Sequence, residues 1–295
     1  MSVVILNPEA HGRKALELWA RVEQSIHADV IVCDWRRAIA NAIRGGERHF
    51  IAAGGDGTVN AVLNAIVESR GGVPLGEFAL GAVGLGSSND FHKPAAALLR
   101  GIPCRLDAAR AAPRDVGLAR YGSLDGTRGE RCFLVSASIG ATAHGNAVFN
   151  SDAVVRRLKS RWTGVAIPYA ALRAISTYRN LAAEISCDGR REATAIANLS
   201  LMKTPYLSGS FRFGTPVPPD DGLFAVKLLE GCGRWRLLRA LAALSFGRTR
   251  GWREFSAAAA VVESRRPMPV ELDGELIEAA RVEFAMLPER IRVCP

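Results

Sequence analysis

The first 84 residues alternate short apolar runs with segments whose apolar side chains recur every three or four positions. The apolar runs cover residues 3–6, 30–33, 50–53 and 78–83, and helical spacing covers residues 14–26, residues 36–43 and the stretch that begins at Thr58. Short apolar runs predict buried strands, and the longer period predicts amphipathic helices. Strands that alternate with helices form a parallel sheet with helices on both faces. The sequence therefore predicts an α/β domain at the N-terminal end.

Unusual residues follow three of these predicted strands. Asn7-Pro8 follows the first strand, GGDGT (residues 54–58) follows the third, and GLGSSND (residues 84–90) follows the fourth. Ligands of parallel α/β sheets bind at the carboxyl ends of the strands. We therefore expect these three segments to line one binding crevice.

The GGDGT segment places Gly54, Gly55 and Gly57 around a single acid, Asp56. A glycine turn that leads into a helix offers backbone N–H groups and a positive dipole end to a phosphate. Thr58 is the expected cap of that helix. The Asp56 carboxylate would repel a phosphate unless a cation lay between them, which predicts Mg²⁺ and nucleotide chemistry. The alternative is a tight strand-to-helix turn with Asp56 exposed to solvent.

From about residue 114 the sequence changes to closely spaced strand candidates. Residues 115–122 and 131–140 look like adjacent strands joined by the turn-rich residues 124–130. A helix is expected over residues 165–178, and further strands are expected over residues 182–187, 193–200, 211–213, 223–230, 258–263 and 270–272. We therefore predict a domain of residues 1–112 and a mostly antiparallel domain of residues 113–295, whose last strand is a candidate to return to the first domain.

The composition is that of an ordinary globular protein, with 48% hydrophobic and 23% charged residues. No apolar stretch is long enough to span a bilayer, and the N-terminus lacks the features of a signal peptide, which predicts a cytoplasmic location. The six cysteines are scattered singly, so neither a zinc site nor a disulfide framework is expected.

The net charge of +9 is concentrated in two regions that also contain aromatic residues. The first region comprises Arg156, Arg157, Lys159, Arg161 and Trp162; the second comprises Arg234, Arg236, Arg239, Arg248, Arg250 and Arg253 with Trp235, Phe246, Trp252 and Phe255. Arginines beside aromatics are typical of peripheral binding to an anionic membrane, here the inner face of the membrane. The same charge would attract nucleic acid, but no nucleic-acid-binding motif accompanies it, so no such partner is expected. Basic helices that only keep the surface soluble are the remaining alternative.

Over its whole length the chain resembles the bacterial soluble diacylglycerol kinases, lipid kinases whose catalytic domain is shared with sphingosine and ceramide kinases. GGDGT alone also resembles loops of NAD kinases and phosphofructokinase relatives. The motifs that carry the resemblance are Asn7-Pro8, GGDGT, GLGSSNDF (residues 84–91), GVAIPYAALRAISTYR (residues 164–179), PPDDGLFAV (residues 218–226) and PVELDGE (residues 269–275).

The resemblance implies a nucleotide-binding α/β domain with a parallel sheet like that of NAD kinases and phosphofructokinases, followed by a β-sandwich-like domain. It implies that Asp56 and Glu275 are catalytic, with Glu275 as the base that accepts the proton of a lipid hydroxyl. It assigns a Mg²⁺ site to Asp221 and the carbonyls of Pro218 and Leu223. The residues that it assigns to ATP binding are Asn7, Gly54, Gly55, Asp56, Gly57, Thr58, Asn60, Gly86, Ser87 and Asn89.

The most favoured activity is therefore transfer of the γ-phosphoryl group of ATP to diacylglycerol. The open alternatives are another lipid alcohol such as sphingosine or ceramide, NAD as the acceptor, and a lipid-binding protein without turnover. Two departures motivate the last alternative: His11 replaces an expected glycine, and Ala61 replaces an expected acid. His11 is expected to be an exposed loop residue, and residues 220–221 and 273–275 could each be simple turns. By analogy of fold, exposed edge strands of the second domain could support a homodimer.

Overall fold

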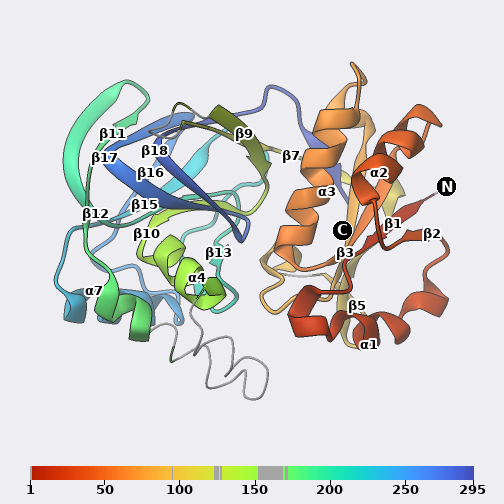
Figure 1. The fold of residues 1–295 in the computed structure, drawn as a ribbon, viewed down its shortest axis with the longest axis horizontal. Coiled ribbons are helices and arrows are strands. Elements are labelled where there is room, and N and C mark those ends of the chain that lie inside the picture. The colour runs from red at the N-terminus through yellow and green to blue at the C-terminus, as the bar shows by residue number, and fades with distance from the viewer. Residues whose placement is uncertain (1, 95, 123–125, 127, 152–168, 170–171) are drawn as a thin grey trace. The chain divides into compact units, whose positions relative to one another are not determined.

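The computed structural model describes residues 2–94, 96–122, 126, 128–151, 169 and 172–295. The chain divides into two compact units, which we call the first unit (Met1–Val116 with Leu287–Pro295) and the second unit (Gly117–Met286). Figure 1 shows the elements of each unit. The C-terminal residues therefore complete the first unit and not the second.

The first unit contains a mostly parallel sheet in the order β2-β1-β3-β4-β19-β7. Its strands are β1 (Val3–Leu6), β2 (Asp29–Ile31), β3 (His49–Gly54), β4 (Ala79–Gly84), β5 (Ala97–Leu99), β6 (Ile102–Arg105), β7 (Ala112–Arg114) and β19 (Ile291–Val293). Its helices are α1 (Ala15–Ala20), α2 (Trp35–Arg44) and α3 (Asp56–Ser69), with the 3-10 helices η1 (Ala10–Arg13), η2 (Glu23–Ser25), η3 (Leu75–Glu77), η4 (Asp90–His92) and η5 (Ala108–Arg110). Strands β6 and β7 pair antiparallel with β4 and β19. The predicted α/β class is confirmed, with antiparallel additions at one side of the sheet.

Helices cover both faces of this sheet. Val4 of β1 and Ile51 of β3 are buried together with Trp19 of α1 in one apolar cluster. Because successive side chains of a strand point to opposite faces, Val3 and Phe50 face the other side. Helices α2 and α3 contact each other, and they contact β1 and β3 respectively. The alternation of strands and helices in the sequence thus gives the expected layered packing.

Two helix predictions were wrong in detail. The helix expected over residues 14–26 is the short α1, because Arg21 and Val22 donate to carbonyls three residues earlier and the last turn tightens before η2. Helix α3 begins at Asp56, and Gly55 is the residue that precedes its first turn. Thr58 therefore lies inside the helix and does not cap it.

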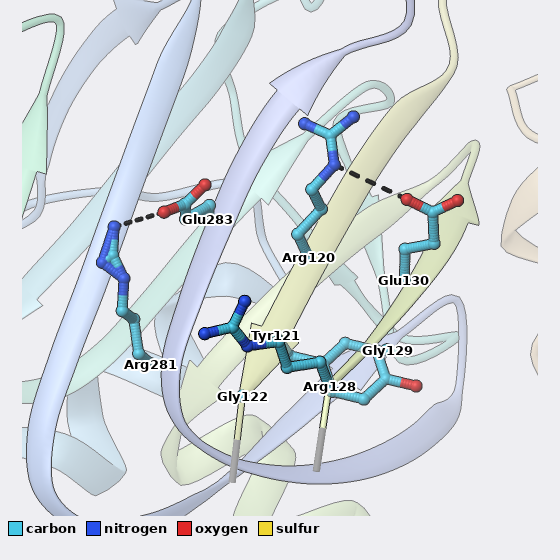
Figure 2. A pocket seen from close by; sticks show the side chains of 8 residues that line it. All are labelled: Arg120, Tyr121, Gly122, Arg128, Gly129, Glu130, Arg281 and Glu283. Carbon is cyan, nitrogen blue, oxygen red and sulfur yellow. Dashed lines mark hydrogen bonds and ion pairs between the residues drawn. The ribbon is translucent and has the colours of Figure 1, made fainter. Parts of the chain in front are cut away.

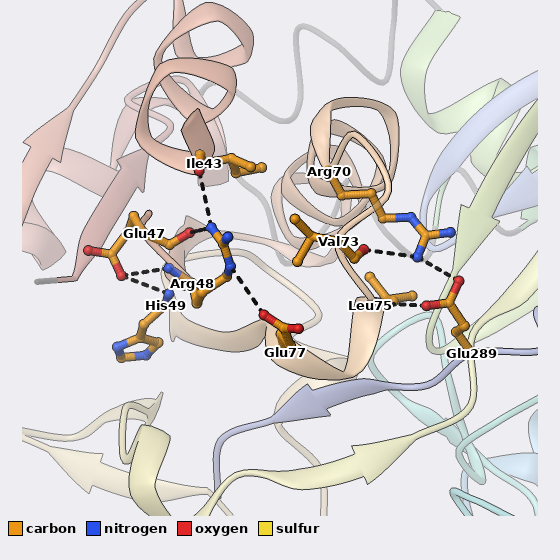
Figure 3. Close-up of polar contacts among 9 residues, drawn as sticks. All are labelled: Ile43, Glu47, Arg48, His49, Arg70, Val73, Leu75, Glu77 and Glu289. Atoms are coloured by element: carbon orange, nitrogen blue, oxygen red, sulfur yellow. Dashed lines mark hydrogen bonds and ion pairs between the residues drawn. The ribbon is translucent and has the colours of Figure 1, made fainter. Parts of the chain in front are cut away.

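The C-terminal segment is tied to the first unit by charged groups as well as by β19. The Glu289 carboxylate accepts a bond of 2.6 Å from Arg70 and one of 2.7 Å from the backbone N–H of Leu75 (Figure 3). These two donors lower the pKa of Glu289. On the other side of η3, Arg48 lies 3.7 Å from the Glu77 carboxylate. The ends of α3 and η3 thus hold the returning chain where β19 pairs with β4.

The second unit is built on an antiparallel sheet in the order β16-β15-β12-β10-β17-β18-β8-β9, with β11 pairing both β12 and β17. The strands are β8 (Gly117–Gly122), β9 (Arg128–Phe133), β10 (Ser136–Gly140), β11 (Leu181–Cys187), β12 (Arg190–Met202), β13 (Tyr206–Leu207), β14 (Phe211–Arg212), β15 (Phe224–Glu230), β16 (Arg253–Ala257), β17 (Ala259–Leu272) and β18 (Glu275–Met286). Its helices include α4 (Ala141–Ser151) and α7 (Arg234–Leu244). The predicted antiparallel domain is confirmed.

Three segments of the second unit differ from expectation. Residues 131–140 form two strands, since the chain turns at Leu134 and Val135 between β9 and β10. The two strands expected within residues 258–272 are one strand, β17, whose pairing with β18 shifts register between Glu263 and Met268. That irregularity accommodates Pro267, which cannot donate to a sheet ladder. Of the helix expected over residues 165–178, residues 172–177 are helical, and most of its beginning lies outside the described residues.

Candidate nucleotide and phosphoryl-transfer sites

The loops that follow β3 and β4 touch each other through their backbones. The two strands are parallel neighbours and pair Gly54 with Gly84 at their ends. Beyond that pair the N–H of Leu85 donates to the Gly54 carbonyl at 2.8 Å. A Cβ atom on Gly86 would lie 2.4 Å from the Cα of Gly55, a separation that neither backbone could relieve. Close backbone approach therefore explains the glycines at positions 55 and 86.

The segment after β1 joins these two loops. The side-chain amide of Asn7 donates to the Thr58 hydroxyl at 3.0 Å. His11 Nδ1 lies 3.2 Å from the carbonyl oxygen of Gly86, and because a carbonyl only accepts, Nδ1 must carry the proton. His11 is half-buried, so the expectation of an exposed loop histidine was wrong. The segments after these three strands therefore contact one another, and the binding crevice expected between them stays a prediction.

Asp56 fastens the second glycine loop to the start of α3. One oxygen of its carboxylate accepts the N–H of Asp90 at 3.0 Å, and the other accepts the N–H of Phe91 at 2.9 Å. Both donors belong to η4, the short helix that ends the GLGSSND loop. A carboxylate in the first turn of a helix is also favoured by the helix dipole. Asp56 therefore has a structural task, and the alternative of an idle, solvent-facing acid is wrong.

The other predicted ATP-binding residues are spread over both loops. Asn89 adopts a positive φ of 51° and folds the second loop with its side chain, which accepts from the N–H of Gly86 and donates to the carbonyls of Gly84 and Gly86. The side chain of Ser87 is exposed at the loop tip. Asn60 lies one turn inside α3, is fully buried and accepts from the Asn64 amide at 3.1 Å. Gly57 occupies the second position of α3.

A buried, uncharged histidine supports the second loop from within. His92 is 4% exposed, and burial, with the nearby Arg105 guanidinium as a smaller cause, lowers its pKa to about 3. A Cβ atom on Gly84 would lie 3.1 Å from the His92 ring. Arg105 donates to the backbone carbonyls of Phe91 and His92 at 3.2 Å, and burial lowers its pKa to about 10. The loop is thus held by a cation and by a neutral ring beneath it.

In the second unit, the DGE segment is the two-residue turn between β17 and β18. Asp273 and Gly274 have positive φ values of 50° and 92° and connect the paired residues Leu272 and Glu275. The buried Asp273 carboxylate accepts the N–H groups of residues 134, 135 and 136 at 2.7–2.9 Å, which explains the break between β9 and β10. Glu275 is half-buried, and its carboxylate lies 3.7 Å from the Arg131 guanidinium. The hairpin is therefore fixed to the start of β10 by hydrogen bonds, and the Glu275 carboxylate lies beside a guanidinium group.

Two of the residues predicted to bind a metal ion contact a buried lysine. Lys203 Nζ lies 2.9 Å from Asp221 Oδ1 and 2.8 Å from the carbonyl oxygen of Leu223. Pro218 is exposed at the start of the same loop. Two of the three predicted ligands thus bind an ammonium group that the sequence analysis did not single out.

Comparison with known families agrees with this architecture. Residues 1–111 match the model of the diacylglycerol kinase catalytic domain, and residues 137–295 match that of the YegS C-terminal NAD kinase beta sandwich-like domain. The chain belongs to this lipid kinase-type family. A "Probable lipid kinase YegS-like" protein of Pseudomonas putida is 26% identical over 268 residues, which cover 88% of this chain and 81% of the relative. A "Probable lipid kinase YegS" of Salmonella heidelberg is 43% identical over 114 residues, covering 37% of this chain and 36% of the relative.

Solved structures share the fold. A diacylglycerol kinase from Bacillus anthracis str. Sterne superposes with a TM-score of 0.61 at 16% identity, over 99% of this chain and 96% of that one. Yeast NADH kinase complexed with NADH superposes with a TM-score of 0.52 at 12% identity, over 100% of this chain and 83% of that one. These likenesses show the architecture of a lipid kinase-type and NAD kinase-like fold.

A separate hollow lies over β8, β9 and β18 of this lipid kinase-type chain. Its lining residues are Arg120, Tyr121, Gly122, Arg128, Gly129, Glu130, Arg281 and Glu283 (Figure 2). Arg120 pairs with Glu130 at 3.5 Å, and Arg281 pairs with Glu283. The hollow contains none of the predicted site residues, and its pairing charges indicate a solvated sheet surface.

Proposed function

We propose that this protein is an ATP- and Mg²⁺-dependent lipid kinase that phosphorylates the hydroxyl of diacylglycerol to give phosphatidic acid. The observation that carries the proposal is the contact between Gly55 and Gly86 at the start of α3. Two loops that meet without side chains leave backbone N–H groups and the positive end of a helix for phosphate groups. The proposal also rests on membership of a lipid kinase-type family.

In this proposal the first unit binds ATP. The N-terminal turn of α3 faces the phosphates, and Asn7, Thr58 and Asn89 keep the surrounding loops in place through their own hydrogen bonds. Asp56 acts in two ways, by holding η4 and by offering its remaining lone pairs to the cation that accompanies ATP. Among the described residues no group of three or more His, Cys, Asp or Glu side chains is placed to hold a metal ion. The single carboxylate of Asp56 thus fits a Mg²⁺ ion that is held largely by the nucleotide. That ion would neutralise the charge of the phosphates.

Glu275 is the proposed base. The oxygen of the lipid hydroxyl bonds to the γ-phosphorus, the bond from that phosphorus to the β–γ bridging oxygen breaks, and ADP leaves. The hydroxyl proton passes to the Glu275 carboxylate. The Asp273-Gly274 turn fixes the backbone of Glu275, and the guanidinium of Arg131, on β9, lies 3.7 Å from its carboxylate.

We further propose that α7 and the turn after it contact the membrane that carries the acceptor. Trp235 is 78% exposed and Phe246 is 74% exposed. Leu237 and Leu241 face the core of the second unit, so Trp235 lies on the opposite, solvent side of the helix, and Phe246 is exposed in the turn that follows it. The accompanying arginines Arg234, Arg236, Arg239, Arg248 and Arg250 are exposed as well. Arginine and aromatic side chains together suit an anionic lipid surface.

This membrane-facing set is smaller than the sequence analysis expected. Trp252 is buried and packs edge-on against Phe213 at 5.2 Å, and Arg253 is paired with Glu230 and Glu192. The region of Arg156, Arg157, Lys159, Arg161 and Trp162 lies outside the described residues. Among the described helices, none is both long and apolar enough to cross a membrane.

The test is transfer of labelled γ-phosphate from ATP to a panel of acceptors in the presence of Mg²⁺. The panel contains diacylglycerol, monoacylglycerol, sphingosine, ceramide and phosphatidylglycerol in mixed micelles, with soluble NAD. We expect labelled phosphatidic acid, a loss of orders of magnitude in kcat for Glu275→Gln, and an unchanged Kd for ATP. Glu278→Gln, an exposed acid on the same strand, is the control and should retain activity. Label in another acceptor would reassign the substrate, and equal activity of both variants would remove Glu275 as the base.

A lipid-binding protein without turnover is the second candidate, and the double hydrogen bond of Asp56 favours it because a structural acid needs no catalytic role. The two candidates differ in one measurement. The second candidate would be supported if the protein binds lipid vesicles and ATP but transfers no label to any acceptor.

A further inference from the structure

The residues to which the family resemblance assigns a structural cation do not fit one here, because a lysine of this chain already binds them. Lys203 follows β12 directly, and its backbone N–H donates to the Val135 carbonyl at 2.9 Å. Its side chain is 1% exposed. The ammonium group donates to Asp221 Oδ1 at 2.9 Å and to the Leu223 carbonyl at 2.8 Å.

These contacts satisfy the demands of a buried charge. An ammonium group withdrawn from water must be paired and hydrogen-bonded, since an unpaired one is strongly destabilising. Asp221 supplies the opposite charge, and its side chain is 33% exposed. The same Oδ1 atom accepts the N–H of Leu223 at 3.1 Å, and Gly222 adopts a positive φ of 74°, so the loop is curled around this oxygen.

A divalent ion bound to Asp221 Oδ1 and the Leu223 carbonyl would share the two oxygens to which the ammonium donates. Mg²⁺ requires oxygen ligands at about 2.0–2.1 Å in near-octahedral geometry. An ion bound to Asp221 Oδ1 and to the Leu223 carbonyl would bring two positive charges next to the ammonium, which donates to both atoms. The low-dielectric surroundings of a buried side chain strengthen that repulsion. The two cations therefore exclude each other at these two oxygens.

We propose that the ammonium group of Lys203 is the built-in cation of this loop, and that the loop needs no divalent ion. Residues 218–223 lead directly into β15, which pairs with β12 beside Lys203 through Met202 and Ala225. The lysine thus fixes the start of β15 to the end of β12, which is the task that a structural ion would perform. This proposal concerns stability and does not depend on the kinase activity proposed above.

The first test is thermal melting of the full chain without nucleotide or lipid, in EDTA and in millimolar MgCl₂ or CaCl₂. We expect the Tm of the unsubstituted protein to be the same in all three conditions. Asp221→Asn should lower Tm by roughly 5–15 °C, because it leaves the buried ammonium without its counter-charge. Asp220→Asn, the exposed neighbouring acid, is the matched control and should melt within about 2 °C of the parent. A rise in Tm with Mg²⁺ that Asp221→Asn abolishes would overturn the proposal.

The second test exchanges the lysine for a metal. Lys203→Ala removes the ammonium and leaves space beside two oxygens, so it should melt lower than the parent and regain several degrees in MgCl₂ or CaCl₂. The control is Lys227→Ala, since Lys227 is also buried and is bound at 2.5 Å to Glu254. A rise for Lys203→Ala alone supports the proposal, whereas a rise for both variants or for neither would overturn it. If Lys203→Ala does not fold, Lys203→Arg is tested in its place. A Tm close to that of the parent without metal supports the role of the Lys203 side chain as the cation of the loop, and a Tm that rises with added metal contradicts it.

Discussion

The most informative single substitution in the first unit is Asp56→Asn, because it separates the structural task of this acid from its proposed task beside ATP. The two oxygens of Asp56 accept different backbone N–H groups, those of Asp90 and Phe91. An asparagine side chain has one oxygen and one NH₂ group, so it can accept only one of these two bonds. The other N–H of η4 would then face a donor.

The expected loss follows from that count. A hydrogen bond to a charged group contributes about 1.5–3 kcal/mol, and a buried donor left without an acceptor costs about 1–3 kcal/mol. We expect Asp56→Asn to lower the free energy of unfolding of the first unit by about 2–4 kcal/mol. For a unit of this size that is a fall in Tm of roughly 5–15 °C. The fall should appear in EDTA and without nucleotide, since it comes from η4 and not from a cation.

The chain offers a matched control in Asp107, which also accepts two backbone N–H groups, those of Ala109 and Arg110, before η5. Both of these bonds go to a single oxygen, Oδ1, so an asparagine can keep both. Asp107→Asn should therefore shift Tm by less than about 3 °C. The assay is differential scanning calorimetry, followed by titration with ATP and Mg²⁺. An unchanged Tm for Asp56→Asn would refute the structural reasoning, and an unchanged Kd for ATP with normal turnover would refute the proposed role beside the nucleotide.

Three further predictions concern the glycine contact, the buried histidine and the exposed aromatics. Gly86→Ala places a methyl group 2.4 Å from the Cα of Gly55, so the Kd for ATP should rise at least about tenfold in a fluorescence titration. An unchanged Kd would exclude the contact between Gly55 and Gly86 as the phosphate site. The pKa of His92 is lowered to about 3, below its value in the unfolded chain, so the unfolded chain binds more protons than the folded chain between pH 6.5 and 3. The stabilisation by neutral His92 is therefore lost as the pH falls through that range. The free energy of unfolding should fall by about 2 kcal/mol between pH 6.5 and 5. His92→Gln should flatten this pH dependence of Tm and the exposed His27→Gln should not, and equal slopes for both variants would contradict the assignment. The double substitution Trp235→Ala with Phe246→Ala should lower the affinity for phosphatidylglycerol vesicles, measured by cosedimentation, about tenfold or more without lowering Tm. An unchanged affinity would show that this surface does not bind the membrane.

The sequence predicted the elements whose periodicity is set by burial on a sheet. Strands β1 and β3 are short apolar runs that pack against helices, so their period and length identify them. The sequence could not show that β17 runs through Pro267, because the register shift between Glu263 and Met268 in its pairing with β18 is what accommodates that proline. It also could not show the turn at Leu134, since that turn is caused by an acid far along the chain.

The same distinction applies to the functional residues. The glycines at positions 54, 55 and 57 were identified because glycine is costly wherever its conformational freedom is not needed, whereas Gly86 was assigned by the family resemblance. His11, Lys203 and Asp273 were missed as contacts because each one acts on a partner that is distant in sequence. Asp273 had a visible signal, the Asp-Gly dipeptide of a tight turn, but that signal describes only its backbone. The burial of its carboxylate among three N–H groups depends on the tertiary structure.

These long-range contacts share one physical logic. Asp56 and Asp273 each place one carboxylate where two or three N–H groups of another segment converge, and Asp221 joins an ammonium group from another segment to an N–H of its own loop. A charged acceptor bonds such donors more strongly than a neutral one, so a single side chain can position an entire loop. In a chain that contains GGDGT, DDG and DGE, an acid can therefore be required for the shape of the chain as well as for its chemistry. Substitution of such acids tests catalysis only when stability is measured beside turnover.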